Sequence, residues 1–404
     1  MKPSFYLIFS LLGLSFFSCS KDLDENETIK PENPTGFLYS IIDGEASVVE
    51  MPAQESVEIP SSVEIKGELY PVTTIENNAC NEAIKSLRLP ESIKVLKPLA
   101  FAGMEVSIER LYIGSLQSWC NIEFQDTFYT VGAHDVYYSV ANPIGPLTTL
   151  YVDEMPIEGE LFVPDGIEAI PPYSFQYLNI ESLRIGNSIE AIGKSAFQYC
   201  KNLKNLDLGE NILEIDNEAF SNTDIREVKL PDSVKSLGGE IFSEATKIVY
   251  IPKSLERCGL VAFPGANEIH IGSLESWVNI DYYSALPYEG TPTPYLLPYN
   301  LFLEDVLLSH VDIPEGVEIL HAYSFCFSQI ESITLPKSIR LIESGVFYNC
   351  IRLSLINIEA TIPPDLEYSS GLPVDIPIYV PAESIDAYLA DPNWGRFSHI
   401  EPLP

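Results

Sequence analysis

Apolar and polar positions follow one short pattern that recurs along the chain. Two apolar residues flank one variable residue, and a Pro or Gly follows. A phenylalanine comes eleven residues after that Pro or Gly. Where nothing interrupts the pattern, it recurs every 21 to 23 residues. The spacing holds in eight segments, at Pro90/Phe101, Pro164/Phe175, Gly186/Phe197, Gly209/Phe220, Pro231/Phe242, Pro252/Phe263, Pro314/Phe325 and Pro336/Phe347.

The pattern predicts the elements of each unit. Apolar residues at period two indicate a short strand with one outward side chain, which Pro or Gly then ends. A second apolar pair, such as Ile189 and Ile192, indicates a second strand or extended turn. A short helical turn then places the Phe in the core. Because one such unit cannot bury its apolar face alone, the period predicts a solenoid in which each turn stacks on the last. We therefore expect a mainly β, right-handed solenoid with parallel strands, short helical turns and a ladder of stacked Phe rings.

Two longer stretches, residues 115–160 and 273–310, interrupt the period and begin alike. The first starts with IGSLQSWCNIEF and the second with IGSLESWVNIDY. They therefore belong to a larger internal duplication, and they are regular longer turns of the same architecture. Trp119 and Trp277 lie at matching positions in them, and we expect both to pack in the local core rather than to bind a ligand.

The remaining segments predict the domain organisation. Residues 36–60 alternate in polarity without the Phe ladder and indicate an N-terminal β cap, which leaves 61–372 for the solenoid. Residues 373–404 also lack the ladder, and Ile385, Tyr388 and Leu389 have helical spacing there. A C-terminal cap over the last strand edge would protect it from aggregation.

The first residues predict export. Residues 1–19 carry Lys2, an apolar run and then Cys19, which is too short a segment for a membrane span. The end of this run resembles a lipobox, with Phe16 in the place where Leu is usual, so a lipidated Cys19 would become the N-terminus. Residues 20–35 are polar, acidic and Pro-bearing and indicate a disordered tether. The resemblance implies a lipid-anchored protein on the surface of the outer membrane, touching the membrane only through its lipid; an ordinary secreted protein is the alternative.

Charge and chemistry narrow the function further. The chain has 58 acids, 23 bases and a net charge of −35, so nucleic acid is not an expected partner. Its seven cysteines include no C-x-x-C pair, its five histidines show no metal-ligand spacing, and the cysteines do not align between neighbouring turns, so we expect no disulfide. A nucleophile elbow and a phosphate-binding Gly loop are absent from the sequence. The carboxylates could bind calcium, although no calcium-loop motif is present. We expect no cofactor and no enzyme activity.

The repeat unit resembles a known group. The pattern I/L-P-x-S/G-I/V-x-x-I-x-x-x-A/S-F, with Tyr-Cys or Asn-Cys after the Phe at Cys200 and Cys350, is similar to the leucine-rich repeat of BspA-type surface lipoproteins of the Bacteroides group. The longer turns and the C-terminal stretch resemble that group too. The resemblance covers roughly residues 36–404. It implies a leucine-rich-repeat solenoid on a bacterial surface that binds or adheres to a host or cell-surface macromolecule, without catalytic residues.

The variable residue of each first strand is the best candidate for ligand contact. Stacking places these side chains in one exposed column that is more basic and aromatic than the whole chain, comprising Arg88, Tyr112, Phe162, Arg184, Asp207, Lys229, Tyr250, His270, Asp312 and Thr334. From it we select the candidate ligand face Arg184, Lys229, Tyr250 and His270, because Tyr and Arg anchor interfaces. A solvated face without a ligand is the plain alternative.

A second functional hypothesis is a glycan-binding accessory protein of a surface uptake system. It would use the tyrosine-rich longer turns, whose aromatic residues are Phe128, Tyr129, Tyr137, Tyr138, Tyr282, Tyr283, Tyr288, Tyr295 and Tyr299. These rings could instead pack the longer turns together.

Overall fold

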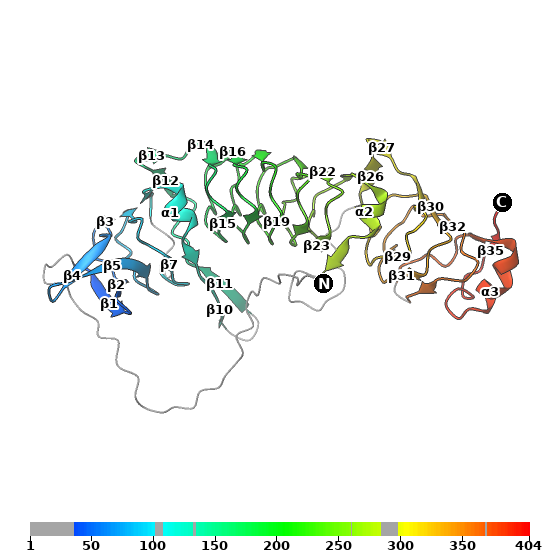
Figure 1. Cartoon of the computed structure of the whole chain (residues 1–404), viewed down its shortest axis with the longest axis horizontal. Helices are drawn as coiled ribbons and strands as arrows, with labels where there is room; N and C mark the ends of the chain where they lie inside the picture. Colours follow the sequence, from blue (N-terminus) through cyan, green and yellow to red (C-terminus); the bar gives the residue numbers. More distant parts are fainter. Residues whose placement is uncertain (1–35, 102–107, 132–134, 260, 284–297, 368–369) are drawn as a thin grey trace, which may run out of the picture.

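The computed structural model describes residues 36–101, 108–131, 135–259, 261–283, 298–367 and 370–404, without the side chains of 127–140 and 283. Cys19 and the expected tether lie outside the described residues. The chain forms an elongated β-solenoid of about 14 turns with parallel strands, as the repeat period predicts (Figure 1). Among the described residues, no helix is both long enough and apolar enough to cross a membrane.

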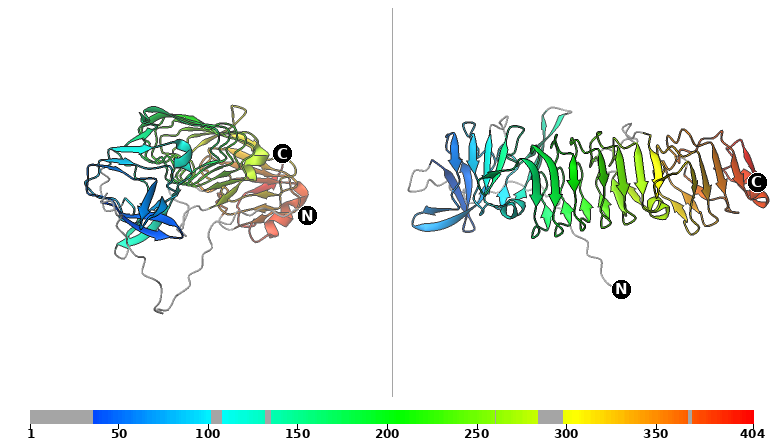
Figure 2. Two further views of the ribbon diagram at one scale, coloured as in Figure 1. Left: turned by 60° about the vertical axis from the view of Figure 1, so that its left-hand side comes forward. Right: turned by 90° about the horizontal axis from the view of Figure 1, so that it is seen from above.

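One row of strands runs along the upper edge of the solenoid in Figure 1, and Figure 2 shows the strands side by side along the long axis. Most of these strands bury both of the apolar residues that flank the variable residue, which explains the period-two pattern. This row contains β3 (Ser56–Glu58), β6 (Ser86–Arg88), β8 (Arg110–Ile113), β12 (Thr149–Val152), β14 (Gly159–Val163), β16 (Ile180–Ile185), β18 (Asn205–Asp207), β20 (Glu227–Lys229), β22 (Ile248–Ile251), β24 (Glu268–Ile271), β26 (Asn300–Leu303), β28 (His310–Asp312), β30 (Ser332–Leu335), β32 (Leu355–Ile358), β34 (Ile378–Val380) and β35 (Ile400–Pro402).

A second row of shorter strands follows the turn that Pro or Gly begins. Its members bury the last apolar residue of the second pair, for example Ile192 and Ile215. They are β5 (Glu68–Ile75), β7 (Val95–Leu96), β9 (Glu123–Phe124), β15 (Ala169–Ile170), β17 (Ala191–Ile192), β19 (Glu214–Ile215), β21 (Ser236–Leu237), β23 (Arg257–Gly259), β25 (Asp281–Tyr283), β29 (Ile319–Leu320), β31 (Leu341–Ile342) and β33 (Asp365–Leu366).

The third side of each turn carries the Phe and consists of consecutive hydrogen-bonded turns. The residue two positions before the Phe has positive φ in successive units, as at Ser195 (53°), Glu218 (59°) and Glu240 (51°). Backbone amides on this side donate to carbonyls of the next turn, as from Phe197 N to Ala219 O at 2.8 Å. The Phe side chains stack inside as predicted, with ring centroids 5.4–6.0 Å apart from Phe175 through Phe197, Phe220 and Phe242 to Phe263.

On this third side, the carboxyl group of Glu240 lies where its negative charge is unfavourable. Burial raises the pKa of Glu240, and the charge of Glu218 one turn earlier raises it further. Because the folded-state pKa is the higher one, this group's contribution to stability is present at low pH and is lost as the pH rises through that pKa. We expect Glu240→Gln to raise the melting temperature by about 1 °C at pH 7 and to leave it unchanged at pH 4.

Thermal unfolding followed by circular dichroism at both pH values measures this effect. Glu244→Gln removes the same charge from an exposed position of the same repeat unit and so corrects for the general effect of reducing the net charge of −35. An equal gain in both variants would contradict the explanation.

The longer turns contain helices that replace a normal unit. Helix α1 (Leu116–Cys120) and helix α2 (Leu274–Val278) begin after Ser115 and Ser273, whose side chains accept the backbone N–H three residues later. Trp119 and Trp277 point inward from these helices and are buried, as predicted. The Trp119 Nε1 donates to Ser174 O at 3.0 Å, and the Trp277 Nε1 donates to Ser324 O at 2.8 Å.

The remaining elements lie at the two ends and in the longer turns. The C-terminal segment folds back on the last turns, where the hydroxyl of Tyr388 donates to Ala360 O at 2.9 Å and the Trp394 Nε1 donates to Pro364 O at 2.7 Å. These elements are β1 (Leu38–Ile42), β2 (Glu45–Glu50), β4 (Ser62–Ile65), β10 (Asp126–Val131), β11 (Asp135–Val140), β13 (Met155–Pro156), β27 (Val306–Leu307), the 3-10 helix η1 (Ala382–Ser384) and α3 (Ile385–Ala390).

Candidate functional site

The variable residues of the first-strand row form the predicted column. Parallel pairing aligns Phe162 with Arg184 and Asp207, and it aligns Lys229 with Tyr250 and His270. The register also adds members that the sequence pattern had not revealed, namely Glu58, Tyr151, Phe302, Asn357, Tyr379 and Glu401.

The column does not lie on one unbroken sheet. The first-strand row divides into four hydrogen-bonded sheets. Two of the breaks follow β12 and β26, because each of these strands turns back into an antiparallel hairpin with β13 or β27. The third break lies between β18 and β20, beside Gly209, whose amide donates to the Asp207 carboxylate at 3.1 Å.

Arg184, Tyr250 and His270 lie in the middle of the column, and each packs against an aromatic ring of a neighbouring strand. The guanidinium of Arg184 lies 4.0 Å from the centroid of the Phe162 ring, and its Nε lies 3.7 Å from Glu160. The ring of His270 stacks on Tyr250 with centroids 4.4 Å apart, and on Phe302 at 4.6 Å. Rings held by their neighbours lose little freedom on binding, which is favourable for an interface.

An acidic hairpin turn contacts this aromatic stack at His270. Glu304 and Asp305 connect β26 to β27, and both have positive φ, as a tight two-residue hairpin requires. Asp305 Oδ1 lies 3.0 Å from His270 Nδ1. The pKa of the Tyr250 hydroxyl is raised, chiefly by burial and then by the nearby charges of Glu227 and Asp305.

The internal duplication has produced a related cluster in the first half of the chain. Asp153 and Glu154 form the equivalent turn, and Glu154 pairs with Arg88 at 2.6 Å. This ion pair lowers the pKa of Glu154. The Arg88 guanidinium lies 4.6 Å from the Tyr112 ring, which stacks on Tyr151 at 4.5 Å. In this cluster the cation Arg88 is paired, whereas Lys229 and Lys253 near Tyr250 and His270 form no ion pair with a described residue.

A recess of about 330 Å³ lies beside Tyr250 and His270. Lys229 and Lys253 line it, and neither forms an ion pair with any described residue. Asp232, Glu304 and Asp305 line it as well, so the recess has mixed charge. It is at the lower end of the size range of small-molecule sites and fits one side chain or one terminal group of a larger ligand.

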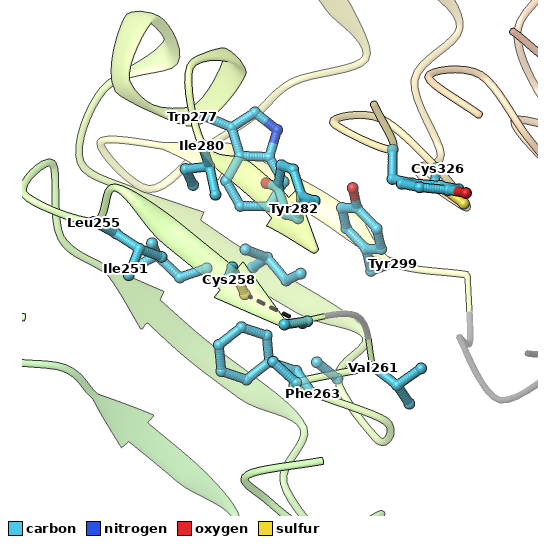
Figure 3. Close-up of a pocket in the computed structure, with 15 residues that line it drawn as sticks. Ile251, Leu255, Cys258, Val261, Phe263, Trp277, Ile280, Tyr282, Tyr299 and Cys326 are labelled. Atoms are coloured by element: carbon cyan, nitrogen blue, oxygen red, sulfur yellow. Dashed lines mark hydrogen bonds between the residues drawn. The ribbon is translucent and has the colours of Figure 1, made fainter. Parts of the chain in front are cut away.

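A second cavity lies inside the solenoid, where the longer turn interrupts the Phe ladder (Figure 3). Phe263, Trp277, Tyr282 and Tyr299 line it, and the buried hydroxyl of Tyr282 has no hydrogen-bond partner among the described residues. Its volume of about 70 Å³ is well below that of a typical ligand site. Tyr282 and Tyr299 therefore pack the longer turn, whereas Tyr288 and Tyr295 lie outside the described residues.

Burial raises the pKa of every described cysteine thiol. The described cysteines Cys80, Cys120, Cys200, Cys258, Cys326 and Cys350 are all free, as predicted. Burial raises the pKa of the Cys200 and Cys258 thiols to about 12, which disfavours the nucleophilic thiolate. The part of the chain that the structure describes contains no group of three or more potential metal ligands.

These features define a class of protein, a β-solenoid built of short repeats with parallel strands. Residues 163–284 and 297–366 match the family model of the BspA type leucine rich repeat region in six copies. The repeat region of the chain therefore belongs to the BspA-type leucine-rich-repeat family, as the repeat unit predicted. No curated protein matches the chain.

Solved structures of bacterial leucine-rich-repeat proteins are similar to this chain. A leucine rich cell surface protein from Faecalibacterium prausnitzii is 16% identical over 83% of this chain and 95% of its own, with a TM-score of 0.37. The pneumococcal vaccine antigen PcpA is 15% identical over 94% of this chain and 99% of its own, with a TM-score of 0.42. A leucine-rich repeat protein from Bacteroides ovatus is 16% identical over 82% and 94%, with a TM-score of 0.35.

Proposed function

We propose that this chain is a surface-anchored, non-enzymatic binding protein that recognises a protein ligand of a host or neighbouring cell through its strand column. The observation that carries the proposal is the run Arg184, Lys229, Tyr250 and His270. In a chain of net charge −35, these basic and aromatic residues lie on one face, and Lys229 is left without an ion pair to a described residue.

The experiment removes two of these side chains together. Arg184→Ala with Tyr250→Ala is expected to weaken binding to a protein ligand at least about thirtyfold, because truncating an interface anchor commonly costs about 2 kcal/mol or more. Biosensor measurements against an immobilised panel of serum and extracellular-matrix proteins supply the affinity. The melting temperature should fall only slightly, since neither side chain belongs to the buried core.

A matched control lies on another side of the solenoid. Arg352 has a side chain 54% exposed, against 52% for Arg184, and it also pairs with a glutamate. Tyr348 is exposed as well. Arg352→Ala with Tyr348→Ala should leave binding intact; equal loss in both double variants, or none in the first, would refute the strand column as the site.

The location is a second part of the proposal, supported by the N-terminal sequence. We infer that a lipid on Cys19 holds the protein at the outer membrane. Cys19→Ala should abolish incorporation of radioactive palmitate and release the protein from the membrane fraction, because one covalent acyl anchor would be lost. Cys80→Ala, which changes a partly buried thiol of the solenoid, is the control. Equal labelling of Cys19→Ala and the unaltered chain would disprove lipidation at this residue.

A further inference from the structure

The third side of the solenoid carries a groove that is separate from the strand column. The groove comprises two hollows of about 300 and 600 Å³ on successive turns that carry the Phe ladder, and Glu218 lines the first while Ser221 of the same unit lines the second. The first is lined by Tyr177, Gln198, Tyr199 and Glu218 among others, and the second continues with residues of the next turns, including Lys201, Ser221, Asn222 and Glu240.

The floor of the groove is a chain of hydrogen-bonded side chains. Gln176 Nε2 donates to Gln198 Oε1 at 3.0 Å, and Gln198 Nε2 donates to Glu218 Oε2 at 2.6 Å. Each amide carries two N–H donors and an oxygen with two lone pairs, so this chain uses only part of its capacity. Side-chain amides can both donate and accept hydrogen bonds, and hydroxyl groups can as well, so the two kinds of group can bind each other in either direction.

The wall of the groove holds two tyrosines in a conformation that a bulky residue avoids. Tyr177 and Tyr199 lie two residues after Phe175 and Phe197, with φ of 63° and 64°. Asn222 and Asn349 occupy the same position after their own Phe residues, and asparagine accepts a positive φ more readily. The two tyrosine rings stack with centroids 4.8 Å apart and remain partly exposed. Phe327 takes the same conformation after Phe325, with φ of 64°, so this backbone is a feature of the repeat, and the paired, partly exposed rings are what distinguish the groove.

The backbone on this side excludes a peptide added as a strand. Tyr177 N donates to Gln198 O and Tyr199 N to Ser221 O, each at 3.0 Å, so these amides are used within the solenoid. The groove has a net negative charge, which disfavours anionic polymers, because its four carboxylates outnumber its two lysines. The carboxylates are Glu218, Asp224, Glu240 and Glu244, and the lysines are Lys194 and Lys201. Aromatic rings beside amides and carboxylates, in a groove along the long axis, fit an extended neutral chain of sugar rings.

We propose that this groove, with Tyr177 and Tyr199 as its platform, binds a linear neutral polysaccharide. The site shares no residue with the strand column, so the two proposals can fail separately. It also differs from the tyrosines of the longer turns, of which Tyr282 and Tyr299 pack the core.

Affinity electrophoresis of the folded chain tests this with four neutral polymers, amylose, mixed-linkage β-glucan, xylan and galactomannan, and with anionic polygalacturonate. At least one neutral polymer should retard the protein, and polygalacturonate should not. Tyr177→Asn with Tyr199→Asn should reduce that retardation at least tenfold, while the melting temperature stays level or rises because asparagine relieves the left-handed strain. Tyr199→Asn alone serves if the double variant fails to fold.

The strand-column variant Arg184→Ala with Tyr250→Ala is the control and should be retarded like the unaltered chain. Failure of every neutral polymer to retard the protein overturns the proposal, as does retardation by polygalacturonate alone. Undiminished retardation of the asparagine variant also overturns it. A fall in melting temperature without any loss of retardation would assign the tyrosines to folding.

Discussion

Replacing Phe220 with Ala is expected to lower the free energy of unfolding by about 3–5 kcal/mol, the usual cost of deleting a fully buried phenylalanine. The ring lies between Phe197 at 5.4 Å and Phe242 at 5.6 Å and is nearly parallel to both, so its loss removes two ring contacts as well as buried area. In a solenoid each turn contacts only its neighbours. The substitution therefore weakens the one interface through which the turns before Phe220 contact the turns after it.

Urea unfolding measures the change, and tryptophan fluorescence reports on separate halves. Trp119 lies before Phe220 in the chain, and Trp277 and Trp394 lie after it. Versions that keep either Trp119 alone or Trp277 alone, each compared with and without Phe220→Ala in the same background, can show whether the two halves unfold together. We expect one transition in the unaltered chain and two in Phe220→Ala. Phe162→Ala, which truncates a phenylalanine 42% exposed on the strand face, should cost less than about 0.5 kcal/mol. If Phe220→Ala lowered the free energy of unfolding by less than about 1 kcal/mol, the stacked rings would not stabilise the contact between neighbouring turns.

The repeat could be predicted from the sequence because its determinants are local. Where two apolar residues both face inward, the residue between them must face outward, so period two assigns Arg184 or Tyr250 to the face without any knowledge of the neighbours. The constant distance from Pro or Gly to Phe then sets the register between turns. Together these two regularities gave the strand column, which the parallel pairing confirms.

The surroundings of the column could not be predicted in this way, because they depend on the longer turns. Tyr151 and Phe302 are variable residues within LYV and LFL, the same apolar-x-apolar pattern as in other strands, but an acidic pair replaces the Pro or Gly. That pair forms a tight hairpin turn, which brings Glu154 to Arg88 and Asp305 to His270. The sequence signal was the matched LYVDEM and LFLEDV segments, since each half of the duplication carries one.

The groove on the third side could not be predicted from the sequence for a different reason. Its walls are set by residues of positive φ on the third side, and the sequence pattern there suggests a helical turn around each Phe. The residue types of Ser195, Glu218 and Tyr199 do not predict a left-handed backbone conformation, whereas a glycine such as Gly345, with φ of 71°, does. Stacking between turns imposes that conformation, because the amides of Ser195 and Tyr199 bond to carbonyls of the next turn.

Trp277→Ala is the second substitution with a large expected effect, again about 3–5 kcal/mol. The indole is buried and contacts Tyr282 and Tyr299 edge to face, with centroids 5.9 and 6.5 Å away. It joins the longer turn to the repeats that follow, because its N–H donates to Ser324 O across 47 residues of sequence. Its removal would also enlarge the neighbouring cavity of about 70 Å³, so nearby side chains could not easily fill the space.

Trp277→Phe separates the hydrogen bond from the packing. It keeps an aromatic ring but leaves the carbonyl of Ser324 without its donor, which should cost about 1–3 kcal/mol. Trp119→Ala and Trp119→Phe repeat the comparison in the first half of the duplication, where the same N–H reaches Ser174 O. Urea unfolding by circular dichroism, which does not depend on the deleted fluorophore, gives all four values. If both Phe variants match the unaltered chain, the hydrogen bonds contribute nothing measurable, and the longer turns are held by ring packing alone.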